Sequence, residues 1–134
     1  MTEKIVIDGE NATLGRLASY VAKQALQGKE VSIVNSEKTI ITGKMKFIKA
    51  DYLQRSSRHG SSQKGPIIDK TPYRLLKRAI RGMLPIREGR GQAAFKRIKC
   101  YNGVPAEFEK SAKVKAGKVK GHIYVKLGDI SKLI

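Results

Sequence analysis

Residues Lys4–Val34 read KIVIDGENATLGRLASYVAKQALQGKEVSIV, with an apolar run at each end and an amphipathic segment between them. The runs Lys4–Asp8 and Val31–Val34 are short and rich in Ile and Val, which predicts strands. Between them, apolar residues at 14, 17, 18, 21, 22, 25 and 26 follow helical spacing, and Gly28 closes the predicted helix. Strand, helix and strand in so short a span form a βαβ unit. We therefore predict an α/β fold with a parallel sheet and a right-handed crossover.

The same patterns predict the remaining elements: strands at 39–42, 98–101 and 122–127, and helices at 44–55, 71–81, 92–97 and 129–134. In the helix at 44–55, we expect four side chains to point inward: Met45, Ile48, Tyr52 and Leu53. Segments 55–70 and 107–121 are rich in small and basic residues. We expect both segments to be irregular, and to become ordered only on a partner.

The segment Thr71–Cys100, TPYRLLKRAIRGMLPIREGRGQAAFKRIKC, combines a helix signal with concentrated positive charge. Thr71 can cap the helix and Pro72 suits its first turn, whereas Gly82 ends it and Pro85 prevents its continuation. One face carries basic side chains at i, i+3, i+4 and i+7: Arg74, Lys77, Arg78 and Arg81. Another face is apolar and is predicted to enter the core: Tyr73, Leu76, Ile80 and Met83, widened by Leu75 and Ala79.

Most basic helix faces are simply solvated, but a solvated face usually mixes the two signs of charge. Between Arg74 and Cys100 there are nine Lys or Arg residues and one acid, Glu88. Like charges at i, i+4 destabilise an isolated helix by roughly 0.2–0.5 kcal/mol per pair. An external anion would offset this repulsion, and the phosphate backbone of a nucleic acid is the commonest one.

Charge is unevenly distributed along the 134 residues, whose net charge is +17 with a pI near 10.2. Residues 1–37 hold four bases and five acids, a net charge of −1, so the other residues carry +18. A hydrophobic content of 40% suffices for one folded domain. We interpret the first third as scaffold and the rest as the binding surface.

Several function classes find no support in the composition. One Cys and two His leave neither a disulfide nor a recognisable zinc set, and we expect Cys100 to be a buried structural thiol. The sequence lacks a long apolar run and a signal-peptide pattern, which predicts a cytoplasmic protein without a membrane partner. Few aromatic residues and no helix-turn-helix or zinc-finger pattern argue against stacked single strands and sequence-specific DNA binding. A folded RNA recognised by shape fits best.

An enzymatic alternative depends on the loop Asp8–Gly15, which follows a strand and precedes a helix. Its glycines do not form a dinucleotide or P-loop motif, and two acids in it would repel phosphate, so a tight turn is the preferred interpretation. His59 has no acid near it in the sequence to orient it as a general base, so an RNA-stacking or solvated role is preferred. We therefore predict no catalytic residue, no metal and no cofactor.

Four motifs together resemble the universal large-subunit ribosomal protein thirteen family: IVIDGENATLGRLAS (5–19), VNSEKTIITGK (34–44), RGMLP (81–85) and RGQAAFKRIKCYNGVP (90–105). The last two are most similar to its archaeal and eukaryotic branch. The resemblance implies a three-layer α/β/α domain with a four-stranded, largely parallel sheet. It also implies no enzymatic activity, a structural and assembly role in the large subunit, and binding to large-subunit ribosomal RNA beside neighbouring ribosomal proteins.

The resemblance places Arg81, Arg90 and Arg97 at RNA contacts, with Gly82, Pro85 and Gly91 shaping the backbone around them. With the charge pattern, the predicted RNA-binding residues are Lys44, Lys46, Arg55, Arg58, His59, Lys64, Arg74, Lys77, Arg78, Arg81, Arg87, Arg90, Lys96 and Arg97. We expect residues 1–106 to form the RNA-binding domain and 107–134 a basic extension packed on it. Two alternatives remain open: a nucleic-acid-compacting protein without a fixed site, and a small nucleotide-dependent enzyme.

Overall fold

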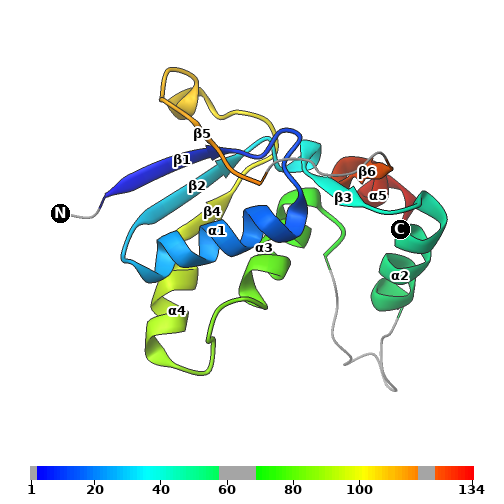
Figure 1. Ribbon diagram of the computed structural model, residues 1–134, viewed down its shortest axis with the longest axis horizontal. Coiled ribbons are helices and arrows are strands. Elements are labelled where there is room, and N and C mark those ends of the chain that lie inside the picture. The colour runs from blue at the N-terminus through cyan, green and yellow to red at the C-terminus, as the bar shows by residue number, and fades with distance from the viewer. Residues whose placement is uncertain (1–2, 58–68, 118–122) are drawn as a thin grey trace.

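The structure is a computed structural model that describes residues 3–57, 69–117 and 123–134 (Figure 1). Its main sheet has the strand order β4-β2-β1-β5 and is parallel throughout. The strands are β1 (Lys4–Asp8), β2 (Glu30–Val34), β4 (Ile98–Cys100) and β5 (Val114–Lys115). Ile7 pairs with Ile33 in register, so both lie in the buried middle of the sheet.

Helices α1 (Leu14–Leu26), α3 (Pro72–Arg81) and α4 (Gly89–Lys96) pack on one face of this sheet, and the 3₁₀ helix η3 (Ala106–Phe108) lies on the other side (Figure 1). The core between sheet and helices includes fully buried Leu17, Ile33, Leu76, Ile80 and Ile98. Burial of such side chains contributes roughly 1.5–3 kcal/mol each.

Helix α1 ends at the glycine that the sequence indicates. Gly28 has a φ of 95°, a conformation that costs glycine little because it has no Cβ. Its amide donates to the carbonyl of Ala25 at 3.0 Å, and the amide of Lys29 donates to that of Gln24 at 3.3 Å. These two bonds form a Schellman motif, which turns the chain directly into β2.

A second, two-stranded sheet joins β3 (Ile40–Thr42) to β6 (Tyr124–Lys126) in antiparallel pairing. The 3₁₀ helix η1 (Ser36–Lys38) precedes β3, and α2 (Met45–Ser57) and α5 (Leu127–Leu133) pack around this sheet. Ile48, Val125 and Ile130 form its small core, whereas Leu127 reaches the main core. The C-terminal segment therefore packs into both clusters.

The predicted α/β class and the four-stranded parallel sheet are confirmed. One strand of that sheet, β5, lies in a segment where no strand was predicted. Segment 107–121 was expected to be irregular, yet it contains η3 and β5, and β5 pairs with β1 through Ile7 and Val114. A two-residue strand is too short to show any periodicity in sequence, so its pairing partner alone defines it. Residues 118–122 of this segment lie outside the described residues.

Three side chains that were expected to face inward are exposed. The exposed fractions are 37% for Met45, 45% for Leu53 and 45% for Met83. Leu84 takes the core position instead, because the chain leaves the helix at Gly82 and no longer follows helical spacing. The predicted helix at 92–97 begins earlier, at Gly89. None of the helices in the described ranges combines the length and apolar character that crossing a membrane requires.

Candidate nucleic-acid interface

Helix α3 presents its basic face to solvent because its apolar face is held in the core by Leu75, Leu76 and Ile80. Arg74 pairs with Asp69 at 3.0 Å, which neutralises part of the charge at the beginning of the helix. Within the described ranges, neither Arg78 nor Arg81 forms an ion pair, and both are exposed. Their guanidinium groups are therefore free to bind an external anion in a bidentate manner.

The basic face borders an open concavity, here called the α3 groove, of about 470 Å³. Its lining residues come from two helices: Tyr73, Arg74, Lys77, Arg78 and Arg81 of α3, and Phe95 of α4. The ammonium group of Lys77 lies 5.0 Å from the ring centroid of Phe95, within range of a cation–π interaction. The groove thus combines four cations with two aromatic rings, and sequence reasoning missed the two rings as site residues.

The turn between α3 and α4 depends on Gly91. A Cβ atom at this position would lie 1.9 Å from the carbonyl oxygen of Pro85, which is too close for any other residue. This contact holds the first turn of α4 against the loop that follows α3. Arg87 lies exposed on this turn and Arg90 lies exposed in the first turn of α4, where its Nε is 2.7 Å from a carboxylate oxygen of Glu88.

Arg97 has a role inside the fold as well as a predicted role outside it. Its Nη1 donates to the carbonyl oxygen of Ala25 at 2.9 Å, which ties the end of α4 to the C-terminus of α1.

Arg97 also lines a pocket of about 380 Å³ on the sheet face opposite α1. Lys4, Lys96 and Lys99 line this pocket too, with Glu30 and Glu107 as its acids. Lys99 was not among the predicted RNA-binding residues. It lies in the three-residue strand β4, whose alternation of apolar and polar side chains does not show which face of the sheet is exposed.

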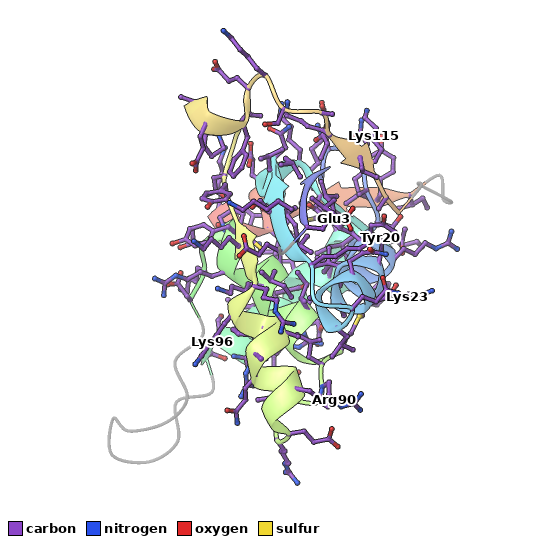
Figure 2. The ribbon with its side chains drawn as sticks, turned by 90° about the vertical axis from the view of Figure 1, so that its left-hand side faces the viewer. Glu3, Tyr20, Lys23, Arg90, Lys96 and Lys115 are labelled. Atoms are coloured by element: carbon purple, nitrogen blue, oxygen red, sulfur yellow. The ribbon has the colours of Figure 1, made fainter. Side chains whose placement is uncertain are left out.

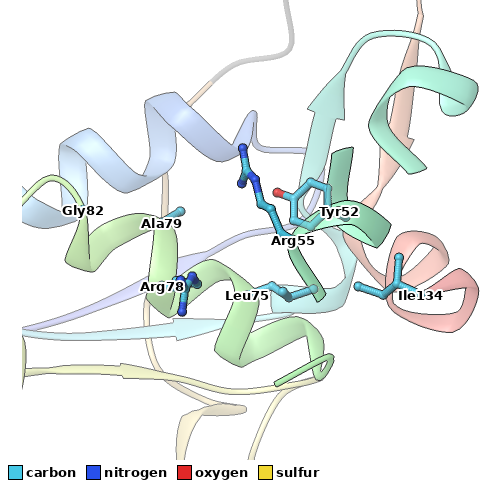
Figure 3. Close-up of a pocket in the computed structure, with 7 residues that line it drawn as sticks. All are labelled: Tyr52, Arg55, Leu75, Arg78, Ala79, Gly82 and Ile134. Atoms are coloured by element: carbon cyan, nitrogen blue, oxygen red, sulfur yellow. The ribbon is translucent and has the colours of Figure 1, made fainter. Parts of the chain in front are cut away.

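Arg55 lies at the C-terminal end of α2, close to α3. It pairs with Asp51 at 2.9 Å and its guanidinium carbon lies 5.4 Å from the ring centroid of Tyr52. Arg55 and Arg78 line the same pocket, between α2, α3 and Ile134 (Figure 3). Burial raises the pKa of Tyr52, and Asp51 raises it further, whereas Arg55 lowers it.

The predicted residues are not gathered in one place. Lys44 and Lys46 are exposed around the beginning of α2, whereas Arg90 and Lys96 project to different sides of α4 (Figure 2). Helices α2 and α4 lie on opposite sides of α3 (Figure 1). Three predicted residues lie outside the described residues: Arg58, His59 and Lys64. The basic surface therefore extends across the molecule, with α3 at its centre.

The loop Asp8–Gly15 forms a tight turn. The Oδ1 atom of Asp8 accepts hydrogen bonds from the amide of Glu10 and from Nδ2 of Asn35, both at 3.0 Å. The turn is closely packed at Gly9, since a Cβ there would lie 3.1 Å from the carbonyl oxygen of Val34, a tight contact. In the described part of the chain, His, Cys, Asp and Glu residues form no group of three or more that could hold a metal ion.

The chain matches the family described as Ribosomal protein L13 over residues 2–107. It is 44% identical to the large ribosomal subunit protein uL13 of Methanopyrus kandleri, over 96% of this chain and 85% of that relative. The protein of the same name from Methanococcus maripaludis is 42% identical, over 97% of this chain and 96% of the relative. The uL13 protein of Methanosphaera stadtmanae is 41% identical, over 96% and 95%.

This chain belongs to the ribosomal protein L13 family. The resemblance noted in the sequence is thus confirmed, and the match extends through the C-terminal segment, because the relatives align over nearly the whole chain. Members of the L13 family are structural ribosomal proteins rather than enzymes, which confirms the prediction of no enzymatic activity. The nucleotide-dependent enzyme is no longer a candidate.

Proposed function

We propose that this chain is a structural component of the large ribosomal subunit that clamps folded ribosomal RNA. Its relatives are named as proteins of that subunit, and this chain carries +17. The observation that supports clamping is the α3 groove, with exposed Arg78 and Arg81 and no acid in its lining. Bidentate contacts to phosphates from separate RNA segments would neutralise their repulsion and fix their packing.

The clamp has a centre and two flanks. The α3 groove forms the centre. Arg87 and Arg90, at the beginning of α4, form one flank. The beginning of α2, together with Arg55 near its end, forms the other. Lys96 and Arg97 add basic charge on the sheet face beside α4. Neighbouring proteins of the subunit are further partners, and the location is the ribosome in the cytoplasm. Neither a membrane nor DNA is required.

Removing two arginines tests the clamp. We expect Arg81→Ala with Arg90→Ala to weaken binding to large-subunit ribosomal RNA, because each phosphate contact releases counterions. The slope of log K against log salt should become shallower by about two units. The circular dichroism spectrum should not change, because both side chains are exposed. Affinity and slope are measured by a filter-binding titration at several salt concentrations.

A matched control uses two bases of the scaffold. Arg16 and Lys23 are exposed on α1, and Lys23 projects on the side of the molecule away from Lys96 (Figure 2). Arg16→Ala with Lys23→Ala removes the same charge from a surface outside the clamp, so it should change the affinity far less. Equal losses in both double variants would favour the compacting protein without a fixed site, and unchanged affinity in the first would refute the clamp.

A further inference from the structure

The pocket between α2, α3 and Ile134, here called the helix-junction pocket, has a volume of about 190 Å³ (Figure 3). Its apolar lining comes from Leu75, Ala79 and Ile134, with the ring of Tyr52 beside them. An apolar cavity of about 150 Å³ accepts a benzene ring, so this pocket has room for a planar aromatic group. Arg55 and Arg78 also line it. Arg55 is paired with Asp51, whereas Arg78 forms no ion pair within the described ranges and supplies an uncompensated positive charge.

Arg78 connects this pocket to the α3 groove, because its side chain lines both. An RNA strand whose phosphates lie in the groove would therefore pass directly beside the pocket. In the described part of the chain, no residue forms a hydrogen bond with the hydroxyl group of Tyr52. A tyrosine hydroxyl is protonated at neutral pH, and burial raises the pKa of Tyr52 further, so this group is available as a donor.

We propose that the helix-junction pocket binds one base extruded from the RNA, while Arg55 and Arg78 contact the phosphates next to it. The proposal rests on the function proposed above and specifies the structure of the RNA: an unpaired nucleotide beside the clamped segments. Proteins bind such bases by stacking them on aromatic rings or on guanidinium planes and by bonding to their edges. The small number of aromatic residues in the chain is no obstacle, since one base requires only one ring.

A variant that fills the pocket without a change of charge tests the proposal. We expect Ala79→Met to raise the Kd for large-subunit ribosomal RNA transcribed from the source organism about tenfold, the scale of one lost stacking interaction. Ala50→Met is the matched control, because Ala50 is exposed on α2 and does not line the pocket. The control should bind as the wild type does. An Ala79→Met protein that is folded and binds as tightly as the wild type overturns the proposal.

A second measurement needs no variant, so it tests base binding in the pocket even if Ala79→Met does not fold. Ultraviolet cross-linking of the wild-type complex, followed by nuclease and trypsin digestion, should yield the peptide Ala50–Arg55 with one nucleotide attached at Tyr52. Cross-links confined to other peptides, such as the one containing Phe95, would contradict base binding in this pocket.

The outcomes separate this inference from the proposed clamp. If the Arg81 and Arg90 double variant loses affinity while Ala79→Met does not, the clamp stands and the base pocket is refuted. If the wild-type chain does not bind the RNA, both are refuted. If Ala79→Met binds free RNA normally but is lost from assembled subunits, the pocket holds an apolar side chain of a neighbouring protein, which also overturns the proposal.

Discussion

At the scale of single residues, the position of the basic turn depends on the absence of a side chain at Gly91. The carbonyl of Pro85 occupies the space where a Cβ atom would be, and both contacting atoms belong to backbone that cannot rotate away. Gly89, in the same helix, has open space around the equivalent position. Replacement by alanine should therefore have opposite effects on stability at the two positions.

We expect Gly91→Ala to lower the free energy of unfolding by at least about 2 kcal/mol, since an added methyl group must push two backbone segments apart. Gly89→Ala should instead be neutral or stabilise the protein by up to about 1 kcal/mol, because alanine loses less conformational entropy in a helix. Urea unfolding of both variants measures the difference. Equal stability of the two would show that the close approach at Pro85 is not present.

Cys100 lies at the end of β4 and is 8% exposed. Burial raises the pKa of its thiol to about 12, against a smaller lowering effect of Lys77. Between pH 9, the ordinary pKa of a thiol, and about pH 12, the Cys100 thiol therefore keeps its proton in the folded state and loses it in the unfolded state. The contribution of this thiol to stability is complete below pH 9 and is lost as the pH rises through 12.

The expected result is a thiol that resists iodoacetamide in the folded protein at pH 8 and reacts once urea unfolds the chain. In addition, the free energy of unfolding should decrease more steeply between pH 9 and 11 for the wild type than for Cys100→Ala. Rapid alkylation of the folded protein at pH 8, or equal pH slopes, would argue against a buried neutral thiol. Tyr and Lys residues also titrate in this range, and because the variant retains them, their contributions to the pH slope cancel in the comparison.

At the scale of elements, α3 was the most predictable part of the candidate site. Its arginines recur at helical spacing, and a buried apolar face at Leu76 and Ile80 leaves them only the solvent side. The aromatic rings of the site were not predictable in the same way. Phe95 meets Lys77 only through the tertiary fold, which brings the C-terminal part of α4 to α3, and no local pattern encodes that distance.

Helix α2 shows where local pattern is insufficient. Its apolar residues are spread around the helix, so no face is selected by the sequence, and Phe47 is 67% exposed while Ile48 is buried. The contacts with α5 and β6, which come from the far end of the chain, select the buried face. The pairing of β5 with β1 and the lining of the helix-junction pocket, which includes Ile134, depend in the same way on residues distant in sequence.

Helix α5 gives a test at this scale. Leu127 and Ile130 are fully buried, and Leu127 belongs to the main core. We expect Leu127→Ala to cost about 2–5 kcal/mol of the free energy of unfolding, with a single cooperative transition. Leu133→Ala, at a site 43% exposed, should stay within about 0.5 kcal/mol of the wild type.

This comparison also concerns the domain organisation, because we propose that residues 107–134 form one cooperative unit with residues 1–106. A Leu127→Ala protein with wild-type stability, or one in which a separate C-terminal transition appears first, would contradict that proposal. Thermal unfolding followed by far-ultraviolet circular dichroism measures both the stability of the variant and the number of transitions.

At the scale of the whole molecule, the segregation of charge is the dominant feature. Residues 1–37 carry a net charge of −1 and supply β1, α1 and β2, the middle of the sheet. Bases that follow them come from α2, α3 and α4. In the ribbon, α3 lies between the other two helices (Figure 1). A surface of this breadth suits a partner with many phosphates arranged in three dimensions, which a folded RNA provides.

The most direct test of this account is the behaviour of the chain on ribosomes of the source cell as salt increases. The ribosomes are washed at increasing salt, separated on sucrose gradients, and the chain is quantified by mass spectrometry. At about 0.5 M salt the Debye length is only about 4 Å, so loosely bound cations are released. We predict that the chain still migrates with the large subunit at that salt concentration. Release into the top fractions at lower salt would contradict an interlocked RNA clamp.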